Sequence, residues 1–340
     1  HALSERREQR ATMGELPSVA QEDLAIVSLL PSLTEVVAEL GLADRLVGIT
    51  HECDYPPDVM RLGLEVVTTS YITGGTQKEI DDEVRASLAE NHSLYALKED
   101  VLGRLKPTHV LTQSLCDVCA VAFDQVERKC ARLLASDPYQ LLSIEPQSLE
   151  DVRQSIETVG AALGCKSEAI ADAVGRFDAK LARVTGALPA PLAAGSASPK
   201  PRVALLEWFD PLFYGGHWIQ EMIQLAGGEY TLASRGERSK VMTAEALAEY
   251  DADVIVLAPC GFSLDRCVRD AKSILFDEKA EAHGWWTNLR AVQHNRVYAA
   301  DGNQFFSRPS PRLADGVMIL AEIMHGSDFG QADHWIRLGA

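Results

Sequence analysis

Four cysteines lie in loops that follow predicted strands. They are Cys53, Cys116, Cys119 and Cys260. Because soft sulfur ligands select zinc or iron–sulfur clusters, four converging thiolates would form a metal site. The alternative is that these side chains pack as small hydrophobic groups. The chain has seven cysteines, an odd number without the spacing of a disulfide framework, and Cys130 and Cys165 are predicted to lie on helices in the core.

Histidine and aromatic residues are expected in the same loops. Neutral imidazole binds cobalt, iron or zinc, so His51 and His217 are candidate ligands of a metal chelate, with a hydrogen-bonded loop histidine as the alternative for each. Aromatic rings gathered at strand ends suit a large flat ligand, and core packing is the alternative for about half of them. The other candidate ligand-binding residues are Glu52, Tyr55, Glu207, Trp208, Trp218, Phe262, Phe305 and Arg308.

Two arginines near the end of the chain offer fixed guanidinium groups. Arg308 and Arg312 alternate with prolines, and each is suited to pair with a ligand carboxylate or phosphate. The alternative is a tether between a helix N-terminus and Asp301 or another acid.

A thiol enzyme is a further hypothesis. A helix that starts just after Cys260 would lower the pKa of its thiol, and His217 or His51 would act as the base. The sequence contains no Gly-x-Ser-x-Gly elbow, phosphate loop or dinucleotide fingerprint, which favours binding over catalysis.

The elements that would position these residues alternate between buried strands and helices. Pro31 and Ser32, with Glu35, predict a capping box that starts a helix directly after the first strand. The last helix is predicted at 313–324. The strands are expected at 24–30, 46–49, 109–112, 140–144, 202–206, 254–257 and 297–300.

A long helical pattern separates two such alternating regions. Residues 148–186 carry apolar residues at the spacing of one helix face, with Ser148 as N-cap and Gly164 as a break or tight join. We therefore predict two α/β lobes with parallel-type sheets, joined by a rigid spine helix, with loops facing a cleft between the lobes. The predicted parts are a polar tail at 1–23, an N-terminal lobe at 24–147, the spine at 148–186, a linker at 187–201 and a C-terminal lobe at 202–340.

Composition excludes some classes of function. The chain has 340 residues, enough for two domains, and a formal charge of -17, which argues against a nucleic-acid-binding surface. No stretch reaches the roughly 20 apolar residues that cross a bilayer. The polar start shows no signal core, and a removed signal would leave no trace.

Several segments distributed along the chain carry a family resemblance. They are Ser28 to Ser32 with Thr34 and Glu35, Leu40 with Gly41, 47–49, 54–57, the predicted spine helix, 226–228 and 296–298. Taken together, these segments resemble the class III solute-binding proteins, the group that includes cobalamin-, iron-siderophore- and haem-binding proteins of ABC importers. The resemblance covers 24–325 and is greatest to the cobalamin-binding branch.

This resemblance implies a non-catalytic protein that holds one bulky metal-containing ligand, with cobalamin or another corrinoid as the first expectation. It also implies lobes that move little and dock through acidic residues on the membrane subunits of an ABC importer. The cleft cysteines depart from the family pattern, so the alternative is a protein with its own zinc or iron–sulfur cluster in a redox, storage or sensing role. The family is normally periplasmic or otherwise extracytoplasmic, whereas free cysteines suit a reducing, cytoplasmic compartment.

Overall fold

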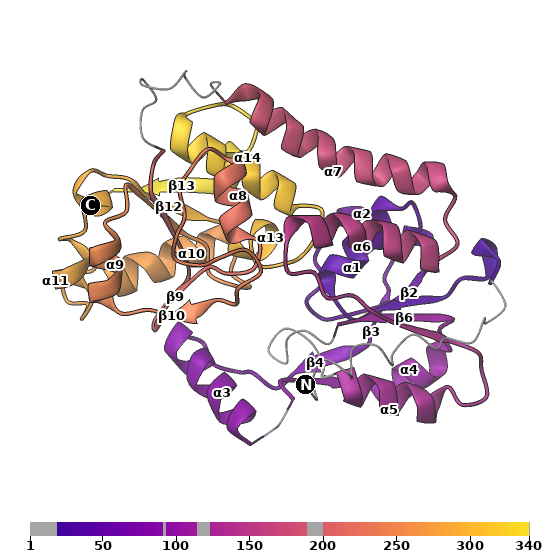
Figure 1. The fold of residues 1–340 in the computed structure, drawn as a ribbon. Helices are drawn as coiled ribbons and strands as arrows, with labels where there is room; N and C mark the ends of the chain where they lie inside the picture. Colours follow the sequence, from indigo (N-terminus) through magenta and orange to yellow (C-terminus); the bar gives the residue numbers. More distant parts are fainter. Residues whose placement is uncertain (1–18, 91–92, 114–122, 189–199, 340) are drawn as a thin grey trace, which may run out of the picture.

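The computed structural model describes residues 19–90, 93–113, 123–188 and 200–339. Figure 1 shows two α/β lobes side by side, the N-terminal lobe in indigo to magenta and the C-terminal lobe in orange to yellow, with a long helix, α7, across both. Within the described ranges, no helix has the length and apolar character needed to traverse a lipid bilayer. The predicted two-lobed α/β fold is confirmed.

The N-terminal lobe contains a five-stranded sheet in the order β3-β2-β1-β6-β7, in which all neighbours are parallel. Its central strands are buried on both faces because helices cover each side. A smaller antiparallel pair, β4 and β5, lies beside it. The strands are β1 (Ile26–Ser28), β2 (Leu46–Ile49), β3 (Glu65–Val66), β4 (Thr68–Ser70), β5 (Tyr95–Leu97), β6 (His109–Thr112) and β7 (Gln140–Ser143). The helices are α1 (Pro31–Glu39), α2 (Pro57–Met60), α3 (Gln77–Ala89), α4 (Glu99–Leu105) and α5 (Phe123–Leu133), with short 3₁₀ turns at Gln21–Asp23 and Ala43–Arg45.

The C-terminal lobe contains a six-stranded sheet in the order β10-β9-β8-β11-β12-β13. Only its centre is parallel, since β9, β10 and β13 run antiparallel to their neighbours, so the expectation of a parallel-type sheet holds for β8, β11 and β12 alone. The strands are β8 (Val203–Phe209), β9 (Leu212–Tyr214), β10 (Lys240–Val241), β11 (Val254–Leu257), β12 (Val297–Ala300) and β13 (Trp335–Leu338). The helices are α8 (Ile219–Leu225), α9 (Ala244–Tyr250), α10 (Leu264–Ala271), a π-helix (Lys272–Phe276), α11 (His283–Trp286), α12 (Arg290–Gln293), α13 (Gly302–Phe305), α14 (Leu313–His325) and a 3₁₀ turn (Ala332–His334).

The predicted spine at 148–186 is two helices, α6 (Leu149–Ala162) and α7 (Ser167–Ala187). Ser148 caps α6 as predicted, accepting a hydrogen bond from the Asp151 amide at 3.1 Å. The helix ends because Gly164 takes a left-handed conformation, with φ of 66°. The chain then reverses, α6 packs on α1, and only α7 lies across both lobes.

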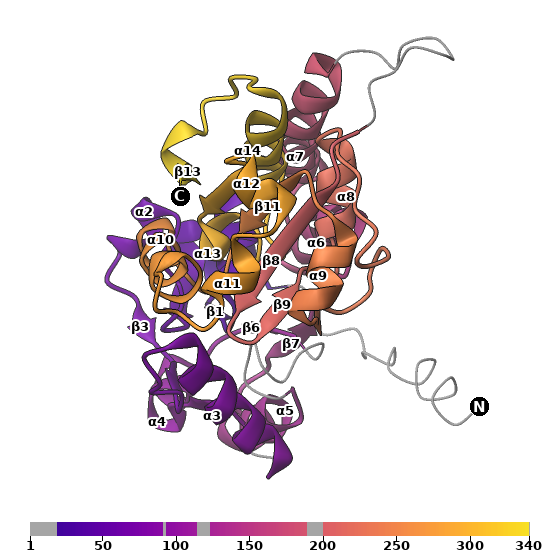
Figure 2. The same ribbon diagram turned by 90° about the vertical axis from the view of Figure 1, so that its left-hand side faces the viewer.

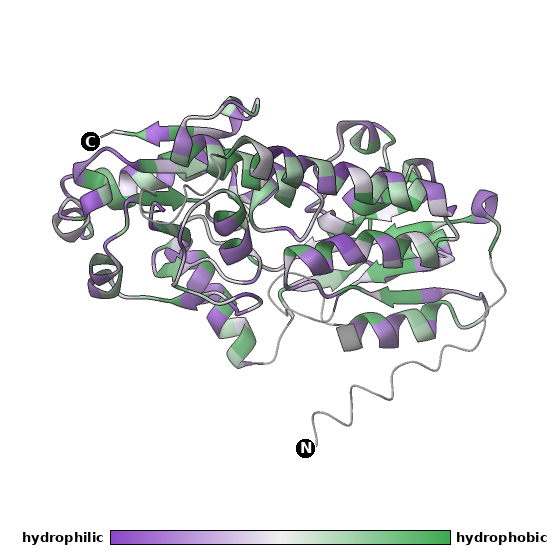
Figure 3. Cartoon of the chain, turned by 45° about the horizontal axis from the view of Figure 1, so that its top comes forward, coloured by the Kyte–Doolittle hydropathy of each residue, from purple (hydrophilic) through white to green (hydrophobic). Residues whose placement is uncertain are grey.

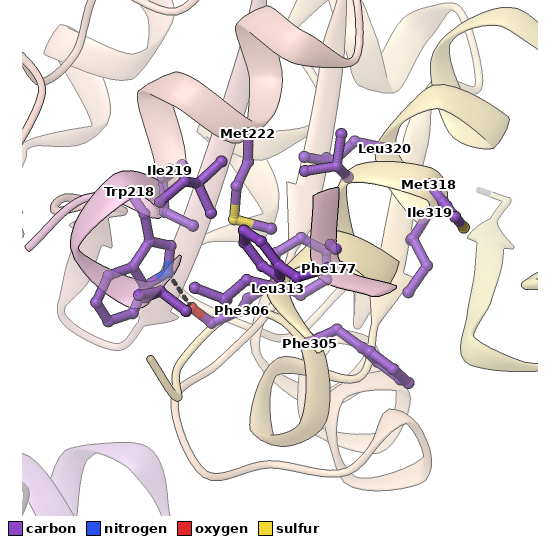
Figure 4. Packing of buried hydrophobic residues seen from close by; sticks show 14 of the residues in the cluster. Phe177, Trp218, Ile219, Met222, Phe305, Phe306, Leu313, Met318, Ile319 and Leu320 are labelled. Carbon is purple, nitrogen blue, oxygen red and sulfur yellow. Dashed lines mark hydrogen bonds between the residues drawn. The ribbon is translucent and has the colours of Figure 1, made fainter. Parts of the chain in front are cut away.

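Helix α7 is tied to one helix of each lobe. Arg176 donates to a carboxylate oxygen of Glu39 on α1 at 2.9 Å, and Lys180 donates to Asp315 on α14 at 2.7 Å. Phe177, between these residues, points into the core of the C-terminal lobe beside Leu313 (Figure 4). The two lobes therefore share one apolar core through α7.

The remaining apolar side chains form two further clusters, one on the outer face of each sheet. In the C-terminal lobe, α8 and α14 cover the face that joins the shared core, whereas α9 and α10 cover the other. In the N-terminal lobe, α4 and α5 cover the outer face. Figure 3 shows hydrophobic residues concentrated in the strands and polar residues on the outward faces of the helices.

Helix α1 does not begin with the predicted capping box. Its N-cap is Leu30, which makes no side-chain cap, and Pro31 takes the first helical position. Glu35 is buried and pairs with Arg312 of the other lobe instead. The capping prediction was wrong because a distant arginine binds the carboxylate.

Candidate ligand-binding junction between the lobes

The carboxyl ends of the parallel strands in the two lobes face each other. In the N-terminal lobe, the loops after β2 and β4 and the first residue of α3 make the contacts. They contact the end of β8, helix α10 and the segment after β12 in the C-terminal lobe. This is the edge at which α/β proteins place ligands. We call the facing residues the interlobe junction. Those that make the contacts are Glu35, Glu52, Asp54, Tyr55, Gly75, Gln77, Trp208, Phe209, Arg266, Asn303, Arg308 and Arg312.

A buried ion pair crosses the junction. The Arg312 guanidinium donates to both carboxylate oxygens of Glu35, at 3.0 and 2.6 Å, and to the side-chain oxygen of Gln304 at 2.9 Å. Glu35 is 2% exposed and Arg312 is 6% exposed. The Tyr55 ring lies 4.1 Å from the guanidinium carbon and covers it. Such a bidentate pair fixes the orientation of one lobe relative to the other.

Arg308 is the second arginine of this tie. It pairs with both carboxylate oxygens of Asp54, donates to the Glu52 carbonyl at 3.0 Å and donates to Asn303 at 2.8 Å. Burial alone would lower the pKa of Arg308, but the hydrogen bonds and charge of Asp54 raise it. Both arginines therefore pair with acidic residues of the chain, which was the predicted alternative to binding a ligand. Arg308 pairs with Asp54 and Arg312 pairs with Glu35, so neither pairs with Asp301. Asp301 instead caps α13 through the Gln304 amide at 2.9 Å.

Two further ties cross between the lobes. The Gln77 side-chain oxygen accepts a hydrogen bond from the Phe209 amide at 2.9 Å, and the Gln77 carbonyl accepts from the Trp208 indole at 3.3 Å. At the start of α6, the Leu149 amide donates to Glu221 of α8 at 3.0 Å. These contacts hold the lobes together at points well separated along the sequence.

His51 lies in the loop after β2, as predicted, and already has polar neighbours. Its Nδ1 lies 2.7 Å from the Thr68 hydroxyl, its Nε2 lies 3.2 Å from Glu52, and its ring centre is 5.5 Å from that of Tyr95. The hydrogen bond from His51 lowers the pKa of Glu52. His51 is therefore a hydrogen-bonded loop histidine whose ring is tilted by 44° against that of Tyr95.

His217 lies away from His51, beside the loop that contains Gly236 and Glu237. Its backbone has φ of 52°, in the left-handed region that few residues other than glycine adopt. Its carbonyl accepts from the Gly236 amide at 2.9 Å. Burial, with a smaller effect of the Arg238 charge, lowers the pKa of His217 and so favours the neutral ring.

The predicted aromatic residues divide into two groups. Trp218, Phe262 and Phe305 are buried, and the Trp218 indole donates to the Phe306 carbonyl at 2.8 Å (Figure 4). Trp218 and Phe305 pack in the shared core. Phe262 instead lies beside Trp208, with ring centres 5.1 Å apart, and under the Arg266 guanidinium. Trp208 is partly exposed and Tyr55 is 36% exposed, so these two rings are accessible at the junction.

Glu207 and Trp208 lie within β8, which is longer than the predicted strand at 202–206. They are therefore not in a loop after it. Trp208 still reaches the junction, because its indole donates to the Gln77 carbonyl at 3.3 Å. The Glu207 carbonyl accepts a hydrogen bond from the Cys260 amide of the same lobe at 3.0 Å.

The structure describes two of the four cysteines that were predicted to form a metal site. Cys53 lies 3.1 Å from the Thr34 hydroxyl, and burial raises the pKa of its thiol to about 11. Cys260 is exposed in the loop after β11. Cys116 and Cys119 lie outside the described residues, so the four-cysteine metal site stays a prediction. Within the described ranges, no three His, Cys, Asp or Glu side chains are arranged to hold a metal ion.

Cys130 and Cys165 were predicted to lie on helices in the core. Cys130 is buried on α5, as predicted. Cys165 lies in the joint between α6 and α7 and is partly exposed, so its placement on a helix was wrong.

Two lobes with facing strand ends and a helix across both define a class III solute-binding fold. A family described as periplasmic binding protein matches residues 26–303, and the chain belongs to that family. The family consists of solute-binding proteins, so the thiol-enzyme hypothesis is not retained.

Relatives are similar over most of the chain. It is 25% identical over 316 residues to an uncharacterized ABC transporter substrate-binding lipoprotein of Bacillus subtilis (strain 168), which covers 92% of this chain and 83% of the relative. It is 24% identical over 300 residues to a vitamin B12-binding protein of Vibrio cholerae, which covers 86% of each.

Solved structures show the same fold. The periplasmic vitamin B12 binding protein of Vibrio cholerae aligns with a TM-score of 0.57 and 19% identity, over 88% of this chain and 96% of that one. A periplasmic heme binding protein from Pseudomonas aeruginosa aligns with a TM-score of 0.63 and 20% identity, over 89% and 93%.

Proposed function

We propose that this protein is the solute-binding component of an ABC importer and holds one bulky metal-containing ligand, a corrinoid, between its lobes. Membership of the periplasmic binding protein family supports the class of function. The vitamin B12-binding relatives, which align over most of the chain, favour a corrinoid. The importer assignment rests on the Bacillus subtilis relative.

The observation that carries the proposal is that each lobe brings an accessible aromatic ring to the junction, Tyr55 from one side and Trp208 from the other. Large flat macrocycles bind well between such rings, since aromatic faces bury much apolar area and the polar ring edges stay available for hydrogen bonds. Haem and ferric chelates belong to the same class of ligand and are the competing outcomes.

The test is titration with cyanocobalamin and cobinamide, with hemin and a ferric siderophore in parallel. We expect saturable binding of one corrinoid per chain by calorimetry, and a rise in melting temperature that grows with ligand concentration. If hemin or the siderophore binds tightly and the corrinoids do not, the protein is still a solute-binding protein, but its ligand is not a corrinoid. No response to any of the four would contradict the solute-binding proposal.

Variants at the junction make the test specific. Tyr55→Ala and Trp208→Ala each remove an accessible ring, and we expect each to weaken corrinoid binding by about tenfold. Trp285→Ala, which removes a partly exposed ring on α11 at the far end of the C-terminal lobe, is the matched control. Equal affinities of all three variants would exclude the two rings from the site.

A further inference from the structure

Helix α3 stands apart from the lobe to which it belongs. Of its 13 residues, only Gln77 is buried. Figures 1 and 2 both place α3 at the lower edge of the molecule, far from α7 and α14, and Figure 1 shows its upper end just below β10 of the C-terminal lobe. We call residues 71–89 the strap. A helix with so little burial is not held in place by its own lobe.

Hydrogen bonds within the strap join its loop to helix α3. The Glu83 carboxylate accepts hydrogen bonds from the Thr73 amide at 2.7 Å and from its hydroxyl at 3.0 Å. The Glu79 carboxylate accepts from the amides of Gly75 and Thr76 at 3.1 and 2.9 Å and completes a capping box. Because these loop amides are bonded to α3 itself, the strap can move without losing them.

The tip of the strap docks on the C-terminal lobe. Gln77 accepts hydrogen bonds from Phe209 and Trp208, and the Gly75 carbonyl accepts from Arg266 at 2.7 Å. The same Arg266 guanidinium lies 3.6 Å from the centre of the Phe262 ring. Docking therefore depends on a few hydrogen bonds at one end of the helix.

One of these docking groups is left unsatisfied. The Gln77 side-chain nitrogen is buried and has no hydrogen-bond partner, although the Gln77 oxygen is bonded. An unpaired buried donor loses its hydration without compensation, which lowers the stability of the docked state. This makes the docked strap easier to release than a fully bonded contact would be.

We infer that the strap docks reversibly on the C-terminal lobe through Gln77 and Arg266 and so controls ligand access to the junction. This inference rests on the proposed function. At the root of the strap, Ser70 of β4 pairs with Tyr95, whose ring lies beside His51. At its tip lies Trp208, one of the two accessible rings. The strap thus spans the side of the junction between these groups, and a bulky ligand passes it when it enters from that side.

The first test is hydrogen exchange in the ligand-free protein. Gln77→Ala with Arg266→Ala removes two docking contacts, and we expect the amides of α3 to exchange about tenfold faster or more. Arg266→Ala alone, a milder change at a partly exposed side chain, is expected to shift exchange in the same direction. Unchanged exchange in α3, or equally faster exchange in the buried helix α14, overturns the inference.

The matched control is Gln293→Ala with Arg269→Ala, since Arg269 lies exposed on the same helix as Arg266 and Gln293 is exposed on α12. We expect α3 exchange to remain at the native rate in this control.

The second test is stopped-flow binding of cyanocobalamin, in which release of the strap should raise the association and dissociation rate constants together and alter Kd less. If the α3 amides exchange faster but the rate constants for cyanocobalamin binding and release are unchanged, the strap does not control ligand access. If no corrinoid binds the native protein, the proposed function fails, while the exchange of α3 still decides whether the strap docks.

Discussion

Arg312 illustrates how single side chains join the lobes. Its ion pair with Glu35 is buried and bidentate, and Gln304 binds a further guanidinium nitrogen. Burying both charges is costly in itself, so the pair contributes more to the relative placement of the lobes than to net stability. Removing one partner, however, leaves an uncompensated charge inside the protein.

We therefore expect Arg312→Met to lower the free energy of unfolding by about 3–5 kcal/mol, measured by urea denaturation. The double variant Arg312→Met with Glu35→Leu removes both charges and should recover much of this loss. Arg61→Met, which removes an exposed pair with Asp58, is the control and should cost about 0–1 kcal/mol. If Arg312→Met matches Arg61→Met, the interlobe pair does not form in solution.

Cys130 gives a prediction about pH. Burial raises the pKa of its thiol from 9.0 to about 11. The unfolded chain releases this proton at a lower pH than the folded chain, so stability is lost as pH rises above 9 until the folded thiol also ionises near 11.

Between pH 8 and pH 10, the free energy of unfolding of the native protein should fall by about 1 kcal/mol more than that of Cys130→Ala. Urea titrations at both pH values measure the difference. Cys260→Ala, which removes an exposed thiol, is the control. Parallel pH profiles for the native protein and Cys130→Ala would show that the buried thiol does not affect stability.

At the scale of elements, the packing of α6 against α7 depends on a glycine. A methyl group at Gly160 would lie 2.7 Å from a side-chain carbon of Ile170 on α7 and 3.1 Å from Leu40. Helices approach this closely only where no side chain separates them.

Gly160→Ala should therefore lower stability by about 1–3 kcal/mol. Gly175→Ala makes the same change on α7 at an exposed site with nothing within 4 Å, so it should raise stability by about 0.5–1 kcal/mol. Thermal melts of the two variants give the comparison. A gain in both would mean that α6 and α7 are not in tight contact.

Most of the buried elements could be predicted from the sequence. The bounds of β2, β6, β11 and β12 match the predicted strands, because a continuous apolar run bounded by turn residues has few other buried conformations. The reversal between α6 and α7 was harder to foresee. The apolar spacing continues across Gly164, and spacing alone does not show whether a glycine bends the chain or ends the helix.

The junction was predicted only in outline. Loops after strands were correctly placed there, but Glu35 resembled a capping residue, and nothing in the local sequence links Gln77 to the other lobe. Partners in these ties are up to 277 residues apart, and a single sequence does not reveal such pairs. The core positions of Trp218 and Phe305 show the same limit, since aromatic content alone does not separate core packing from ligand contact.

At the scale of the whole molecule, the hydrogen bonds and ion pairs between the lobes indicate that the lobes are held rigidly relative to each other. The Glu35 pair, the Asp54 pair and the Glu221 contact to α6 lie at different places between the lobes, and α7 bonds to both lobes. A hinge motion would break several of these together.

We therefore expect the radius of gyration from small-angle scattering to stay unchanged when cyanocobalamin is added. Release of the strap moves few residues and would not alter this. Buffer without ligand provides the reference, and Arg312→Met, which lacks the Glu35 pair, shows whether the lobes loosen. A large compaction of the native protein on ligand addition would contradict the rigid arrangement.

The two arginine tethers also limit how this chain can be recombined. Each guanidinium comes from one lobe and its carboxylate from the other, so the lobes are matched to each other at Glu35 with Arg312 and at Asp54 with Arg308. A chimera that joined one of these lobes to its counterpart from a relative with different residues there would bury a charge without its partner. We therefore expect that grafting the ligand specificity of a relative requires exchanging both sides of the junction together.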